Sequence, residues 1–203
     1  MKSVTLLVVL FAMIIGSAMA YDIGVSAHPF TLQSQVINTE IDYAASNGTG
    51  TGVGVRYFRR FSSNINFDAG LGVNSGEREN RIFTGLDYQI FPDYGNQPRI
   101  SVKGLYSYST EFEQNVHRIG FAPVISKGLN VYGEEVFPFV SLPLQIGLNS
   151  DSNKYQTINT LAFGATAKLP VNGYDKLLVN FETQINFRNS FNAVSLGISL
   201  PIN

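Results

Sequence analysis

The sequence predicts an all-β protein whose strands close into an antiparallel, up-and-down transmembrane β-barrel. Three observations carry this prediction. Long segments alternate between apolar and polar residues, as strands with two unlike faces do. Charged residues make up only 14% of the chain, against about 25% in typical soluble domains. The chain also begins with a segment that predicts export from the cytoplasm.

Residues 1–20 have the three parts of a secretory signal peptide. Lys2 gives a positive start, residues 4–15 form an apolar stretch, and Ala18-Met19-Ala20 matches a small-residue cleavage site. The apolar stretch is shorter than the roughly 20 residues that a membrane-spanning helix needs. We therefore expect a signal peptide over residues 1–20 and one outer-membrane β-barrel domain over residues 21–203.

The alternation and the turn residues between segments predict about ten strands, and eight or twelve remain possible. The number is open because residues 30–49 form a long connection that could itself extend into strand. Pro138 and Pro143 also interrupt one strand, since each removes a hydrogen-bond donor from the ladder. Most of the strands are long enough to cross a bilayer when tilted. They are expected at Tyr21–Pro29, Gly50–Arg60, Ile65–Asn74, Arg81–Phe91, Arg99–Ser109, Asn115–Ser126, Val136–Leu148, Tyr155–Leu169, Lys176–Arg188 and Phe191–Leu200.

The segment INFDAGLGVN, residues 65–74, shows the two faces of such a strand. Ile65, Phe67 and Leu71 fall on one face, whereas Asn66, Asp68 and two glycines fall on the other. A soluble barrel coats its exterior with Lys, Glu, Arg and Asp. The polar faces here carry mainly small residues with sparse charges of both signs, which suits a narrow and crowded lumen. We therefore expect the apolar face to contact lipid and the polar face to line the interior.

Charged residues on the polar faces should pair inside the lumen and brace the wall. We expect Asp68, Asp87 and Glu182 to pair with Arg56, Lys103, Arg118 or Lys168. The predicted lumen charge network is therefore Arg56, Asp68, Asp87, Lys103, Arg118, Lys168 and Glu182.

The signal segment, the alternating strands INFDAGLGVN and LLVNFETQINF, and the closing strand FNAVSLGISL together resemble the small bacterial outer-membrane β-barrel proteins of the OmpA-like and OmpW-like class. The resemblance covers the whole chain after residue 20. It implies a Gram-negative cell outer membrane, with both termini on the periplasmic side. It also implies contact with outer-membrane lipid and lipopolysaccharide, assembly by the barrel-insertion machinery, and a monomer.

Several kinds of chemistry find little support in the sequence. The net charge of −1 gives no electrostatic case for nucleic acid, and the absence of cysteine excludes disulfides. We expect no metal, no cofactor and no catalysis. An enzyme at the rim would need His28 or His117 beside a Ser, Asp or Glu. The partners within possible reach are Ser26, Asp42, Glu77, Glu111 and Glu113.

The favoured function is therefore a structural membrane barrel, or a porin-like narrow path for small solutes. One alternative is a lipid-modifying enzyme or ligand-binding barrel that acts at the rim. A second alternative is a soluble periplasmic, lipocalin-like binder, in which the apolar faces would point inward around an apolar ligand.

Overall fold

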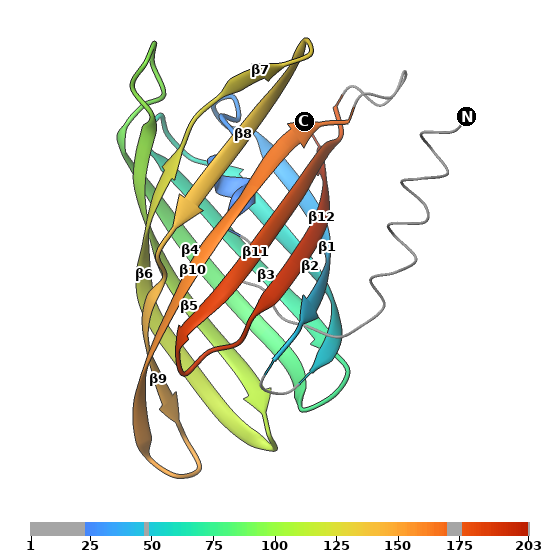
Figure 1. Cartoon of the computed structure of the whole chain (residues 1–203), viewed down its shortest axis with the longest axis vertical. Helices are drawn as coiled ribbons and strands as arrows, with labels where there is room; N and C mark the ends of the chain where they lie inside the picture. Colours follow the sequence, from blue (N-terminus) through green and yellow to red (C-terminus); the bar gives the residue numbers. More distant parts are fainter. Residues whose placement is uncertain (1–22, 47–48, 170–175, 203) are drawn as a thin grey trace, which may run out of the picture.

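The computed structural model describes residues 23–46, 49–169 and 176–202 (Figure 1). The predicted signal peptide at residues 1–20 and the expected turn at residues 170–175 lie outside the described residues. Within them, no helix is long and apolar enough to cross a membrane.

Strands in one antiparallel sheet make up nearly the whole structure, and the sheet closes on itself (Figure 1). Consecutive strands pair, except β6 with β7 and β8 with β9. Because β1 also pairs with β12, and β10 pairs with β11 over most of the wall, the sheet closes into a barrel. The strands are β1 (Gln35–Ala44), β2 (Gly50–Arg60), β3 (Ile65–Asn74), β4 (Arg78–Phe91), β5 (Arg99–Glu111), β6 (Gln114–Ser126), β7 (Leu129–Val131), β8 (Glu134–Ser141), β9 (Leu144–Asn149), β10 (Lys154–Lys168), β11 (Leu178–Arg188) and β12 (Ala193–Pro201).

Eleven of these twelve strands fill ten positions in the barrel wall. Strands β8 and β9 share the position between β6 and β10, where β8 pairs with residues 124–126 of β6 and β9 pairs with residues 116–121. The break falls at Leu142 and Pro143, where proline removes a ladder donor, as the sequence predicts. Strand β7 pairs only with β8 and forms a hairpin that extends beyond the wall (Figure 1). The predicted antiparallel barrel of about ten strands is confirmed.

The predicted first strand, Tyr21–Pro29, is wrong for residues 23–29, and its first two residues lie outside the described part of the chain. Gly24–Ala27 forms a short 3-10 helix, η1, inside the barrel, and the first wall strand is β1, within the segment expected to be a long connection. Strand β1 fits the wall because it pairs along its length with both β2 and β12. Its own alternation also places Asn38, Glu40 and Asp42 inside.

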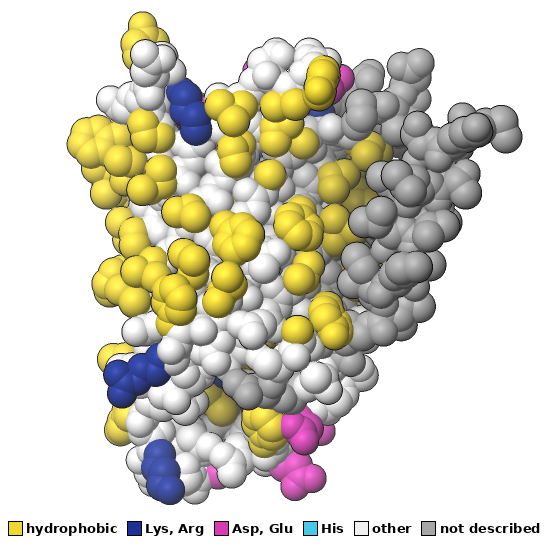
Figure 2. All heavy atoms as spheres, viewed as in Figure 1, with side chains coloured by type: hydrophobic (Ala, Val, Ile, Leu, Met, Phe, Trp, Pro, Cys, Tyr) yellow, Lys and Arg dark blue, Asp and Glu magenta, His cyan; other side chains and the backbone are white. Residues whose placement is uncertain are grey.

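The two faces of the wall have the orientation that the sequence predicts. Along β4, the side chains of Ile82 and Leu86 are 60% and 53% exposed, whereas Asp87 is fully buried. The charged residues of β1, β3 and β5 are all buried on the inner face: Glu40, Asp42, Asp68, Arg99, Lys103 and Glu111. Figure 2 shows hydrophobic side chains across the middle of the wall and charged side chains near its two ends.

The apolar exterior predicts a difference between two leucines that are equally exposed. Leu86 lies in the middle of β4, and Leu129 lies on the β7–β8 hairpin outside the wall, with exposed fractions of 53% and 47%. Leu86→Arg should lower the free energy of unfolding by about 2–4 kcal/mol, because the charge would enter hydrocarbon. Leu129→Arg should change it by less than about 0.5 kcal/mol. Urea titration of the barrel folded in lipid vesicles measures both; equal effects would contradict a lipid-facing wall.

Candidate functional site

The interior of the barrel holds a network of charged side chains from five neighbouring strands. Asp68 of β3 accepts hydrogen bonds from Arg56 of β2 at 2.8 Å and from Lys103 of β5 at 2.7 Å. Arg56 also lies 3.3 Å from Glu40 of β1. Arg81 of β4 reaches the same carboxylate, Glu40, at 2.7 Å. All five side chains are buried, so these contacts act with little screening by water.

Phe83 lies between two of these cations. The guanidinium of Arg56 is 4.4 Å from the centre of its ring, and that of Arg81 is 4.6 Å away. Arg81 also contacts Asp42 at 3.2 Å. Cation–π contact with a desolvated ring is favourable, so Phe83 holds the two guanidinium groups apart while the carboxylates neutralise them.

Two smaller ion pairs lie nearer the barrel ends. Arg118 of β6 contacts Glu111 at 2.5 Å, and Ser109 donates a hydrogen bond to the same carboxylate. At the other end, Arg99 pairs with Asp87, which also accepts a hydrogen bond from Asn66 at 2.9 Å. The interior is therefore lined with opposite charges from end to end.

Glycines on the inner face make room for these pairs. A Cβ atom at Gly85 would lie 2.6 Å from Lys103 Cε and 2.7 Å from Asp68 Oδ1. A Cβ at Gly54 would lie 2.8 Å from Glu40 Oε1. Both positions face the lumen, where any larger side chain would displace a charged neighbour.

The structure brings most of the predicted network residues into the interior. Arg56, Asp68, Asp87, Lys103, Arg118 and Glu182 are buried there. Lys168 is not part of the network: its side chain is 45% exposed at the end of β10, and it lies 3.8 Å from the exposed Glu135. Glu182 faces the chain near the N-terminus, where it accepts a 2.5 Å hydrogen bond from the main-chain N–H of Ile23 and a 2.7 Å bond from Gln184.

Several network residues were missed from the sequence, although their positions carry a signal. Arg81, Arg99 and Glu111 share the inward phase of their strands but lie at strand ends. Glu40 and Asp42 were missed because β1 was expected to be a connection. The interior residues that the sequence did not identify are Glu40, Asp42, Arg81, Arg99 and Glu111.

The segment Ile23–Phe30, which contains η1, lies inside the barrel; we call it the plug segment (Figure 1). Ile23 and Ala27 pack in a buried cluster with Leu105, Val124 and Phe139 of the wall. A second cluster joins the segment to the wall with Val25, Phe30, Val36, Phe58 and Leu178. Lys103 donates a hydrogen bond of 3.1 Å to Ser26, which joins the plug segment to the ion network.

The two histidines lie far apart in the structure, in different surroundings. His28 packs edge-on against Phe30 and Phe137, and its Nδ1 atom is buried without a hydrogen-bond partner. Burial lowers the pKa of His28 from 6.5 to about 4, and the positive charge of Lys168 adds to the effect. His117, on β6, makes a 3.0 Å hydrogen bond with the Tyr106 hydroxyl. Within the described residues, no three His, Asp or Glu side chains are grouped to hold a metal.

No model of a known protein family matches the chain, and no curated protein matches it. The solved structures that are similar in fold include the following three. The first is a de novo designed transmembrane β-barrel, with a TM-score of 0.41 and 16% identity over 86% of this chain and 100% of that one. The second is KdgM porin, with a TM-score of 0.36 and 11% identity over 84% of this chain and 99% of that one. The third is Ail, the attachment invasion locus protein of Yersinia pestis, in complex with the heparin analogue sucrose octasulfate, with a TM-score of 0.29 and 7% identity over 83% of this chain and 95% of that one. These similarities concern the fold alone.

The buried ion network predicts that a substitution of Asp68, at its centre, lowers the free energy of unfolding strongly. Asp68→Asn leaves Lys103 and Arg56 without their shared carboxylate, and an uncompensated buried charge costs about 3–5 kcal/mol. The matched control is Lys168→Gln, which removes an exposed ion pair worth less than about 1 kcal/mol. The free energy of unfolding of both variants is measured by urea titration in detergent micelles, with the folded fraction read from heat-modifiable migration on gels. A loss no larger for D68N than for K168Q would contradict a stabilising network.

The lowered pKa of His28, in the plug segment, predicts that acid lowers the free energy of unfolding. Its pKa is about 4 in the folded chain and 6.5 when exposed, so the unfolded state binds more protons between these values. Stability should therefore fall as pH decreases from 6.5 towards 4, by up to about 3 kcal/mol. His28→Phe should remove this component, since two phenylalanine rings already surround the site. The free energy of unfolding of both proteins at pH 7 and pH 4.5 tests this; an identical decrease in the variant would count against it.

Proposed function

We propose that this chain is an outer-membrane β-barrel protein that acts without catalysis, as a structural barrel with a closed lumen. The observation that carries the proposal is the division of side chains between the two faces of the wall. Aliphatic and aromatic side chains cover the exterior, and charged side chains are paired inside. In a bilayer, a closed barrel satisfies every main-chain polar group, and lipid solvates the apolar exterior.

The filled interior supports a closed barrel over an open porin. Barrels of eight strands have interiors that side chains fill, and ten strands add only a little width. Here the wall also encloses the plug segment, whose apolar side chains are packed against the inner face. A narrow path for small solutes would have to pass both this segment and the ion network.

The soluble, lipocalin-like alternative is not compatible with the structure, because its apolar faces would point inward. The inner face instead carries the charged residues, and large aliphatic side chains point outward. A rim enzyme has less support than a structural barrel. The side chain that hydrogen-bonds His117 is Tyr106, which is not one of the Ser, Asp or Glu partners expected for a rim enzyme. His28 is enclosed by phenylalanines.

Planar-bilayer recordings test the closed barrel. The protein lacking its signal peptide should give no conductance in the nanosiemens range, because the plug segment and the paired charges block the lumen. A variant that also lacks residues 23–30 should conduct more, since the plug segment is removed from the lumen. Large stable currents from the complete protein would rule out the proposal. Failure of the protein to insert into the bilayer, with full folding in plain buffer, would rule out the membrane location itself.

A further inference from the structure

The ladder between β10 and β11 stops before the end of the wall. It starts at Lys168 and Leu178 and ends at Asn159 and Arg188, with a shift of register beside Asn159. Beyond this point, the first residues of β10, from Lys154 to Ile158, pair only with β9. One end of the barrel wall therefore has a notch, with one edge of β10 lacking a strand partner.

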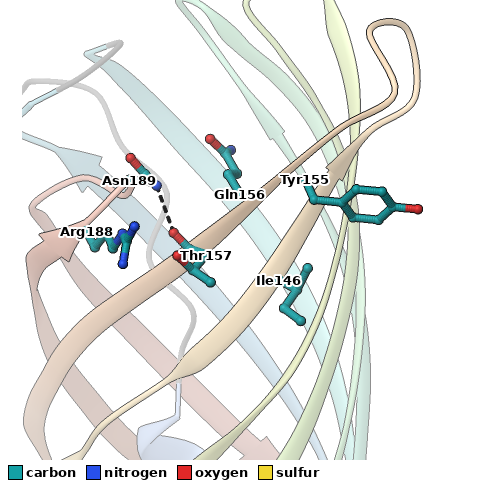
Figure 3. A pocket seen from close by; sticks show the side chains of 6 residues that line it. All are labelled: Ile146, Tyr155, Gln156, Thr157, Arg188 and Asn189. Carbon is teal, nitrogen blue, oxygen red and sulfur yellow. Dashed lines mark hydrogen bonds between the residues drawn. The ribbon is translucent and has the colours of Figure 1, made fainter.

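The notch forms an open pocket of about 460 Å³ (Figure 3). Asn189 donates a 2.9 Å hydrogen bond to the main-chain oxygen of Thr157 across it. The main-chain N–H of Thr157 points in the same direction, because both groups of one residue lie on the same side of an extended strand. The residues that line the notch are Ile146, Tyr155, Gln156, Thr157, Arg188 and Asn189.

The lining combines one cation with an apolar outer border. Arg188 is exposed and forms no salt bridge within the part of the chain that the structure describes. Beside it, Phe187 is 60% exposed on the outer face of β11, and Ile146 is 52% exposed on β9. A guanidinium with amide donors suits a phosphate, and an apolar border at a barrel rim suits an acyl chain.

We propose that the β10–β11 notch binds a phosphorylated membrane lipid. The phosphate contacts Arg188, with Asn189 and the free edge of β10 as further donors, and an acyl chain lies outside the wall along Ile146 and Phe187. This inference rests on the proposed membrane location. A second copy of this chain that pairs with the edge of β10 is the other occupant considered, and the experiment below separates it from lipid.

The test measures lipid that stays bound when the purified barrel is released from nanodiscs into native mass spectrometry. Two nanodisc preparations are compared: one of zwitterionic phospholipid alone, and one that also contains lipid A bearing phosphate groups. We expect the complete protein to retain lipid A, and Arg188→Gln to retain about tenfold less, as expected for the loss of one charge-assisted contact. Arg59→Gln is the matched control, because Arg59 lies near the other end of the wall, over the Phe61 ring.

Each outcome decides between occupants. Retention that R188Q lowers and R59Q leaves unchanged supports the lipid site, and lipid A without phosphate should then bind as weakly as the variant. Equal retention by R188Q and the complete protein overturns it. Displacement by millimolar inorganic phosphate alone would show a simple anion site, without the acyl contact. A disulfide between two chains carrying Thr157→Cys would show pairing of β10 edges between copies, which also overturns it.

Insertion is measured in the same samples by heat-modifiable migration. If the complete protein does not enter nanodiscs, the proposed membrane function fails. If it enters and retains lipid A no better than R188Q does, only the lipid site fails.

Discussion

The pairing of charged side chains inside the lumen is the constraint on which the rest of the structure depends. A buried charge without a partner costs several kcal/mol, so each carboxylate in the interior needs a cation or hydrogen-bond donors at a defined depth. These partners come from different strands. The contact between Arg81 of β4 and Glu40 of β1 joins strands that are not neighbours in the wall, because only Gly54 and Gly72 lie between them in the same row. The network therefore fixes the relative register of β1 to β5.

This constraint also explains why the exterior is so uniform. A shift of one residue in the register of any strand would move its charges to the outer face and its aliphatic side chains into the lumen. Asp68 would then leave both Arg56 and Lys103 unpaired. The ion network and the apolar exterior consequently specify the same register from opposite sides of the wall, which leaves little freedom for alternative pairings.

Much of the wall could be predicted from the sequence, because strands with two unlike faces keep a period of two along their length. Strand β3 begins and ends where the alternation of INFDAGLGVN does. The N-terminal region could not be predicted in the same way. Residues 21–29 also alternate, but a period of two over so few residues does not separate a wall strand from a short segment that packs inside a barrel. The ion partners were predicted as a set, whereas the individual pairs depend on register and strand tilt, which the alternation does not contain.

The plug segment shows why the interior needs more than wall side chains. Ion pairs occupy much of the lumen, but the inner face also carries buried apolar residues, including Phe58, Leu105 and Val124. These apolar side chains would face water in an open lumen, and the plug segment covers them. Ile23 also donates a hydrogen bond to Glu182, and Ser26 accepts one from Lys103, so the plug segment contacts polar residues of the wall as well. It is therefore a component of the barrel core, and the wall and its N-terminal segment form one packed unit.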